Sequence, residues 1–203
     1  MLDNRANQFL KPILERISLF LLKFNFLPNQ LTFLGFIVGC LSFVFLATGM
    51  VYVAFIFFII NRIIDGTDGT MARLTKPTDL GGYYDIISDF FIYALIPFGF
   101  ILFDEKNYLS MSFLLLSFMG TCATFLTTAW IFEKKKMELK ITSKKSFHYS
   151  NGLIEGTETI IFFSLMFLFN QIASLVAWIF AILCIFTSVM RVINVRKVLI
   201  STN

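Results

Sequence analysis

Long apolar segments, separated by short polar or basic connections, dominate this sequence and limit what it can fold into. A segment of about 20 apolar residues is long enough for a helix to cross the hydrocarbon core of a bilayer. The hydrophobic fraction of 57% and the mean hydropathy of +0.78 exceed those of soluble globular chains. We therefore predict an all-α integral membrane protein with six transmembrane helices. The spans are expected near residues 31–49, 51–73, 82–103, 108–132, 153–169 and 172–193.

An amphipathic segment precedes the first predicted span, at residues 4–24. Its apolar side chains recur at the spacing of a helical face, with charged residues between them. A helix of this kind suits the boundary between lipid and water, so an N-terminal interfacial helix is predicted. Pro28 should end that segment, and Asn29 is placed to cap the next helix. The length of 203 residues favours a single membrane domain over residues 1–203.

Basic residues indicate which side of the membrane each connection faces. The sequence holds 17 Lys and Arg residues, and with six spans all of them except Lys106 fall on one side. The positive-inside rule assigns that side, and with it both chain ends, to the cytoplasm. Topology alone can account for the net charge of +4, and attraction of the basic loop at residues 133–152 to anionic lipid headgroups is the alternative. Membrane lipids are therefore expected partners, and nucleic acid is not.

Four aspartates lie in the second and third predicted spans. Asp65 and Asp68 are three residues apart and Asp85 and Asp89 are four apart, so each pair shares one helix face. A short connection makes the two helices antiparallel neighbours, and helix rise places all four acids near the cytoplasmic headgroup boundary. Carboxylates so close together repel each other and need cations. Ligands that are all oxygen favour Mg²⁺, Mn²⁺ or Ca²⁺, and two such ions could clamp a diphosphate.

Small and basic residues beside these acids fit a phosphate substrate. Gly69 and Ala72 leave the helix surface open next to the second acid, and Arg73 offers a fork for phosphate oxygens. Gly81 permits close helix approach, and Thr78 is placed to cap the third span. Two other interpretations remain open at this point. The small residues could serve helix packing alone, and the acids could form a structural ion network with nearby arginines or line an ion pathway.

The whole pattern resembles the signature of the CDP-alcohol phosphatidyltransferase family, and no position departs from it. The signature reads Asp65-x-x-Asp68-Gly69-x-x-Ala72-Arg73, then seven residues, then Gly81-x-x-x-Asp85-x-x-x-Asp89. The segment Pro28–Thr32 is also similar to that family. The segments Lys145–Tyr149 and Gly152–Thr159 resemble the YnjF-like branch of bacterial inner-membrane proteins. The resemblance covers most of the chain.

This resemblance implies a function and a set of roles. The family transfers a phosphatidyl group from a CDP-alcohol, here expected to be CDP-diacylglycerol, to an alcohol acceptor and releases CMP, in phospholipid biosynthesis. It implies that Asp65, Asp68 and Asp85 bind two Mg²⁺ or Mn²⁺ ions, and that Asp89 both contacts metal and acts as the catalytic base. The residues implied to bind the CDP-alcohol are Asn29, Gln30, Leu31, Thr32, Gly69, Ala72, Arg73, Thr78 and Gly81. A homodimer in the bacterial inner membrane, with its active site facing the cytoplasm, is implied as well.

The acceptor alcohol is not specified by the sequence. Candidate acceptor contacts are Glu155, Glu158, Arg191 and His148. Each has a simpler interpretation: the glutamates favour a helix N-terminus, the arginine reaches the interface, and the histidine is an ordinary loop residue. For the arginine we favour the interface. The competing functions are a Mg²⁺-dependent membrane prenyltransferase and a membrane transporter without enzymatic activity.

The charge asymmetry generates a topology prediction. Reporter fusions at Met50 and Asn170, in two short uncharged connections, should give signals from outside the cytoplasm. A cytoplasmic signal at either position would overturn the arrangement of six spans with both ends inside.

Overall fold

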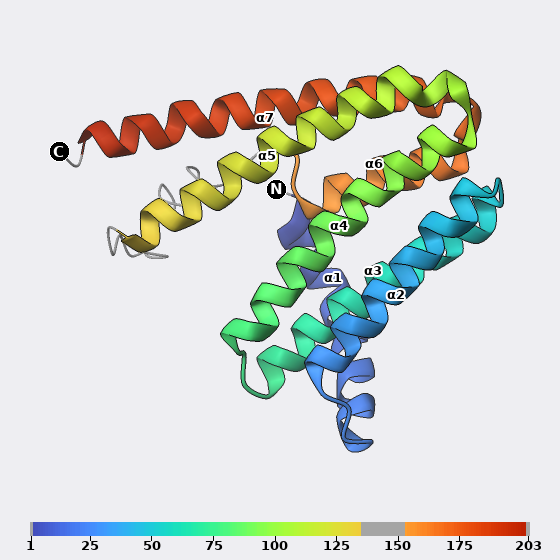
Figure 1. The fold of residues 1–203 in the computed structure, drawn as a ribbon. Helices are drawn as coiled ribbons and strands as arrows, with labels where there is room; N and C mark the ends of the chain where they lie inside the picture. Colours follow the sequence, from blue (N-terminus) through green and yellow to red (C-terminus); the bar gives the residue numbers. More distant parts are fainter. Residues whose placement is uncertain (1, 135–152, 202–203) are drawn as a thin grey trace.

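The computed structural model describes residues 2–134 and 153–201, and its regular secondary structure there is entirely helical (Figure 1). The elements are α1 (Leu2–Lys23), α2 (Pro28–Ala47), α3 (Val51–Leu74), α4 (Asp79–Phe103), η1 (Glu105–Asn107), α5 (Tyr108–Lys134), α6 (Gly156–Leu168), η3 (Asn170–Ile172) and α7 (Ala173–Ser201). Six of these helices match the six predicted segments to within a few residues at most ends.

Four helical segments in the described ranges are long and apolar enough to cross a membrane. They are Pro28–Ala47, Asp79–Phe103, Glu105–Lys134 and Asn170–Ile200. Helix α3 has 24 residues but carries Arg62, Asp65, Asp68 and Arg73, and α6 has only 13 residues. The predicted class, an all-α membrane protein, is therefore confirmed, while the count of six spans stays a prediction.

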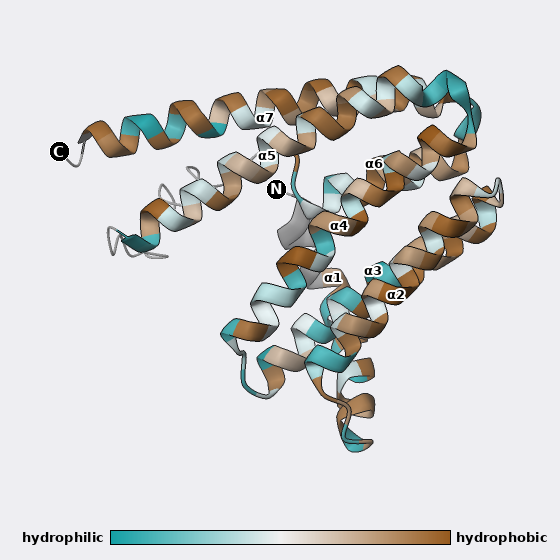
Figure 2. Cartoon of the chain, in the orientation of Figure 1, coloured by the Kyte–Doolittle hydropathy of each residue, from teal (hydrophilic) through white to brown (hydrophobic). Residues whose placement is uncertain are grey.

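Three of the connections between helices gather at one end of the bundle. The α2–α3 turn, η1 between α4 and α5, and η3 between α6 and α7 lie toward the right in Figure 1. The α3–α4 connection and the C-terminus lie toward the opposite end. Figure 2 shows apolar residues along the helices and hydrophilic residues concentrated at several connections.

Helix α1 packs against α3 and α6. The hydroxyl of Ser18, which is fully buried, donates a hydrogen bond of 3.2 Å to the carbonyl of Thr67 in α3. Elsewhere α1 exposes large apolar side chains such as Phe9 and Phe20. A helix with one face on protein and apolar side chains left exposed fits the predicted interfacial position.

The start of α2 differs from the expected cap. Leu27 is the N-cap residue, Pro28 is the first helical residue, and the side chain of Gln30 accepts the backbone N–H of Leu27 at 3.0 Å. The prediction that Asn29 caps this helix was therefore wrong. Proline suits the first helical position because its fixed φ is already helical and the N–H it lacks would have no intrahelical partner.

An aromatic core joins the C-terminal helices to α3 and α4. The rings of Phe58 in α3, Phe100 in α4 and Phe167 in α6 are fully buried. The Phe167 ring centroid lies 5.5 Å from that of Phe58 and 5.3 Å from that of Phe100. One turn earlier in α6, Phe163 packs on Phe180 of α7 at 5.7 Å. The short helix α6 is thus a central packing element.

Close approach of α2 to α3 and α4 depends on a glycine. A Cβ atom built on Gly39 would lie 2.3 Å from Cδ1 of Ile92, which is fully buried, and 3.1 Å from Nδ2 of Asn61. Small residues at such positions let membrane helices pack closely.

Replacing this glycine should loosen the bundle. Gly39→Val is expected to cost about 1–3 kcal/mol, because overpacking forces neighbouring side chains out of position. Thermal unfolding in detergent measures the loss as a lower Tm. Gly82→Val is the matched control, since a Cβ atom there meets nothing within 4 Å. Equal Tm values for the two variants would contradict the close contact.

Candidate functional site

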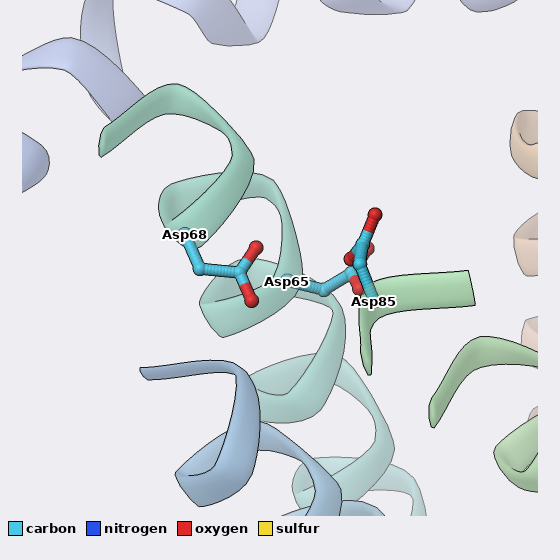
Figure 3. A group of neighbouring side chains, drawn as sticks. All are labelled: Asp65, Asp68 and Asp85. Atoms are coloured by element: carbon cyan, nitrogen blue, oxygen red, sulfur yellow. The ribbon is translucent and has the colours of Figure 1, made fainter. Parts of the chain in front are cut away.

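Three aspartates converge where α3 and α4 face each other. Asp65 and Asp68 come from neighbouring turns of α3, and Asp85 comes from the second turn of α4. One carboxylate oxygen from each lies within 4.8 Å of the others (Figure 3). The helical spacing and the short α3–α4 connection produce this convergence. We call these three residues the aspartate cluster.

Asp68 is the buried member of the cluster. Its exposed fraction is 3%, and both carboxylate oxygens are buried without a hydrogen-bond partner in the described part of the chain. A carboxylate in this state carries a large desolvation cost that a cation can offset. Oxygen ligands alone suit hard divalent ions such as Mg²⁺ or Mn²⁺. The aspartate cluster therefore fits a divalent cation.

Asp89 is oriented differently from the other three aspartates. Its Oδ1 atom accepts a hydrogen bond of 2.8 Å from Nη1 of Arg62. The same Nη1 atom lies 3.7 Å from Oδ2 of Asp65. Part of the acidic group is thus an ion network, as the structural interpretation proposed. Arg73 does not join it: within the described residues it forms no salt bridge and donates to the Thr70 hydroxyl at 2.9 Å.

A cavity of about 480 Å³ opens beside the cluster, between the end of α3 and the starts of α2 and α4. Asp68 and Asp85 lie in its wall. It is also lined by seven of the nine residues expected to bind a CDP-alcohol, namely Asn29, Thr32, Gly69, Ala72, Arg73, Thr78 and Gly81. Two members of the aspartate cluster and most of the predicted nucleotide-binding residues therefore line one space.

Glycine and threonine shape the mouth of this cavity. The hydroxyl of Thr78 accepts the backbone N–H of Gly81 at 3.1 Å, so the predicted cap of α4 is confirmed. A Cβ atom on Gly81 would lie 2.9 Å from Oδ1 of Asn29. A side chain at Gly81 would therefore fill the gap between the starts of α2 and α4.

Two predicted binding residues are not in the cavity wall. Gln30 accepts a hydrogen bond from the Leu27 backbone, and Leu31 is 4% exposed in the protein interior. Helical periodicity explains the split, because Asn29 and Thr32 are three apart on one face while the two residues between them point elsewhere.

Sequence reasoning missed several residues that line the cavity. They are Leu27, Pro28, Thr75, Lys76, Pro77 and Gly82. Lys76 matters most, because it brings a second positive charge beside Arg73. In the sequence its charge indicates topology. Its position three residues after Arg73, in the connection between α3 and α4, indicates that it lies near the same site.

The predicted acceptor contacts lie in other surroundings. Glu155 is the N-cap residue of α6, and Oε2 of Glu158 accepts its backbone N–H at 3.2 Å, which supports the helix-end interpretation. Arg191 is 7% exposed and donates to the Thr121 carbonyl at 3.1 Å and the Thr124 hydroxyl at 3.2 Å. The expectation that Arg191 extends to the interface was therefore wrong, because α5 supplies hydrogen-bond acceptors for it within the bundle. His148 lies outside the described residues.

Comparison with known proteins identifies the family. The family model described as CDP-alcohol phosphatidyltransferase matches residues 25–190. The chain therefore belongs to the CDP-alcohol phosphatidyltransferase family, whose members move a substituted phosphate group from a CDP-alcohol to an alcohol in phospholipid synthesis.

Two curated relatives span nearly the whole chain. The inner membrane protein YnjF of Escherichia coli is 42% identical over 193 residues, covering 95% of this chain and 94% of its own. The archaetidylinositol phosphate synthase of Pyrococcus horikoshii is 29% identical over 189 residues, covering 92% and 93%. The expected likeness to the YnjF branch is confirmed.

Solved structures share the fold. The phosphatidylinositol phosphate synthase PgsA1 of Mycobacterium tuberculosis with CDP-DAG bound has a TM-score of 0.66 at 21% identity, covering 91% of this chain and 94% of its own. The same enzyme with manganese and citrate has a TM-score of 0.64 at 18% identity, covering 90% and 88%. At these identities the likeness establishes the fold.

Cation binding to the cluster can be measured without turnover. Mn²⁺ should raise the Tm of the wild-type protein, because it offsets repulsion among buried carboxylates. Asp68→Asn should unfold at a higher Tm than wild type without metal, because it removes an unpaired buried charge, and should lose most of the Mn²⁺ effect. Asp79→Asn, at an exposed position outside the cluster, is the control. A full Mn²⁺ response in Asp68→Asn would contradict the assignment.

Proposed function

We propose that this protein transfers the phosphatidyl group of CDP-diacylglycerol to a small alcohol and releases CMP, using divalent metal at the bacterial inner membrane. The observation that carries the proposal is the shared cavity: Asp68 and Asp85 of the aspartate cluster line the same space as Arg73 and Lys76. A diphosphate is the substrate group that needs metal-binding carboxylates and basic side chains close to each other.

Donor binding follows from the cavity lining. Arg73 and Lys76 supply positive charge for the diphosphate, and Gly69 lets a phosphate approach the α3 backbone. Large apolar side chains, including Leu27 and Leu80, are exposed near the starts of α2 and α4, where acyl chains can lie in the bilayer. A donor with a polar nucleotide end and a lipid end matches this arrangement.

The metal would be held by Asp65, Asp68 and Asp85, whose carboxylate oxygens converge. When bound, Mg²⁺ or Mn²⁺ would offset the diphosphate charge and that of the departing CMP. The solved complex of PgsA1 with manganese supports a divalent ion here. A second ion, with Asp89 as a ligand, remains part of the proposal.

Asp89 is proposed as the base. Its side chain is 30% exposed and lies one turn of α4 from Asp85. The acceptor oxygen forms a bond to the phosphatidyl phosphorus, and its proton passes to Asp89. The bond from that phosphorus to the bridging oxygen breaks, and its electron pair leaves with CMP. A base must reach the proton it removes, so the orientation of this carboxylate is decisive.

The proposed setting is a single membrane domain, since the family match covers residues 25–190. YnjF is named an inner membrane protein, which supports the same location here, with the site facing the cytoplasm and the chain acting as a homodimer.

CMP release tests the proposal. Purified protein with CDP-diacylglycerol, Mg²⁺ and a pool of small alcohols should release CMP and form a new lipid identified by mass. EDTA should abolish the reaction, and Mn²⁺ should restore it, because the carboxylates cannot neutralise the diphosphate themselves. Asp79→Asn should retain full activity. No CMP release with any acceptor, full activity in chelator, or pyrophosphate release from a prenyl diphosphate instead would overturn the proposal.

A further inference from the structure

Arg62 lies outside the family signature but contacts its last aspartate. It is on α3, one turn before Asp65, and its side chain is 6% exposed. Its Nη1 atom donates to Oδ1 of Asp89 at 2.8 Å and to the hydroxyl of Tyr93 at 3.2 Å. The guanidinium therefore binds two side chains that are one turn apart on α4.

The orientation of this guanidinium is fixed from α2 as well. Asn61, which is 2% exposed, donates to the carbonyl of Gly35 at 2.8 Å and accepts the Nε–H of Arg62 at 2.7 Å. The Arg62 Cζ atom also lies 5.2 Å from the centroid of the Tyr93 ring. Residues of three helices thus fix the Arg62 side chain, and its planar guanidinium in turn orients the Asp89 carboxylate.

We propose that Arg62 is a positioning residue that fixes the Asp89 carboxylate for proton removal from the acceptor alcohol. The inference rests on the proposed function. Arg62 holds Oδ1, while Oδ2 accepts no hydrogen bond within the described residues and is available to the acceptor hydroxyl. Without Arg62, the Asp89 side chain can rotate away from this orientation, because no other hydrogen bond to its carboxylate is formed within the described residues. Correct orientation of a reacting group contributes substantially to the rate.

A purely structural role makes different predictions. Buried ion pairs contribute little net stability, but loss of one partner leaves an unpaired charge and lowers stability. A structural Arg62 would therefore affect folding, metal binding and donor binding together. A positioning Arg62 would affect turnover and spare metal and donor binding.

The experiment compares Arg62→Gln, Arg62→Lys, Asp89→Asn and the double variant Arg62→Gln/Asp89→Asn. Assays measure kcat, the KM for CDP-diacylglycerol, Mn²⁺ affinity by titration, and Tm. We expect Arg62→Gln to lower kcat on the order of 100-fold, while KM and Mn²⁺ affinity stay close to wild type. Arg62→Lys should recover part of kcat, because it restores the charge without the planar fork. The double variant should be no slower than Asp89→Asn alone.

Controls separate the possible failures. Arg16→Gln, at an exposed position on α1, should match wild type. Tyr93→Phe removes one contact of the guanidinium and keeps the ring, so it should also lower kcat selectively, and it carries the test if Arg62→Gln does not fold.

Three results would overturn the inference alone. The first is a wild-type kcat in Arg62→Gln, or in Tyr93→Phe where Arg62→Gln does not fold. The second is Mn²⁺ binding by Arg62→Gln that weakens in step with turnover. The third is that the losses of kcat in the two single variants add up in the double variant. If wild-type protein releases no CMP, the proposed function is overturned, and the inference with it.

Discussion

Placing carboxylates between the packed helices α3 and α4 is unfavourable because a charged group loses hydration there. The chain meets this cost in two ways. Asp89 receives an internal cation, since Arg62 binds it at 2.8 Å. Asp68 receives none, because both of its oxygens are buried without a partner in the described residues. The first carboxylate is satisfied by the fold, whereas the second is satisfied only when a cation binds. Much of the site is organised around this difference.

The surrounding helices keep this polar region in place. Small residues on α2 allow α3 and α4 to approach it closely. A Cβ atom on Gly39 would collide with Ile92, and Asn61 donates a hydrogen bond to the Gly35 carbonyl. Farther along the helices, the aromatic core of Phe58, Phe100 and Phe167 joins α3, α4 and α6. A packed apolar region thus supports an open polar region, which lets a site of hydrophilic side chains stay ordered beside lipid.

Sequence patterns predicted the parts of this structure that depend on spacing along one helix. Apolar length placed the helices, and the three- and four-residue spacings placed Asp65, Asp68 and Asp85 on facing surfaces. Lateral arrangement was less accessible. Arg191 and its acceptor Thr121 are 70 residues apart, and only the packing of α5 on α7 brings them together. The pairing of Arg62 with Asp89 likewise depends on how α3 and α4 are rotated, which spacing alone does not specify.

The position of Asp89 relative to the cavity bears on the direction of the reaction. The cavity wall includes Asp68 and Asp85 with the basic residues Arg73 and Lys76, but not Asp89. Substitution at phosphorus places the entering and leaving oxygens roughly in line, on opposite sides of the transferred group. If the nucleotide occupies the cavity, CMP departs on the side of Arg73. The acceptor must then approach from the other side, where α4 carries Asp89 one turn beyond Asp85. Arg62 contacts Asp89 and is likewise absent from the cavity wall, so it would orient the proposed base without occupying the space that the nucleotide needs.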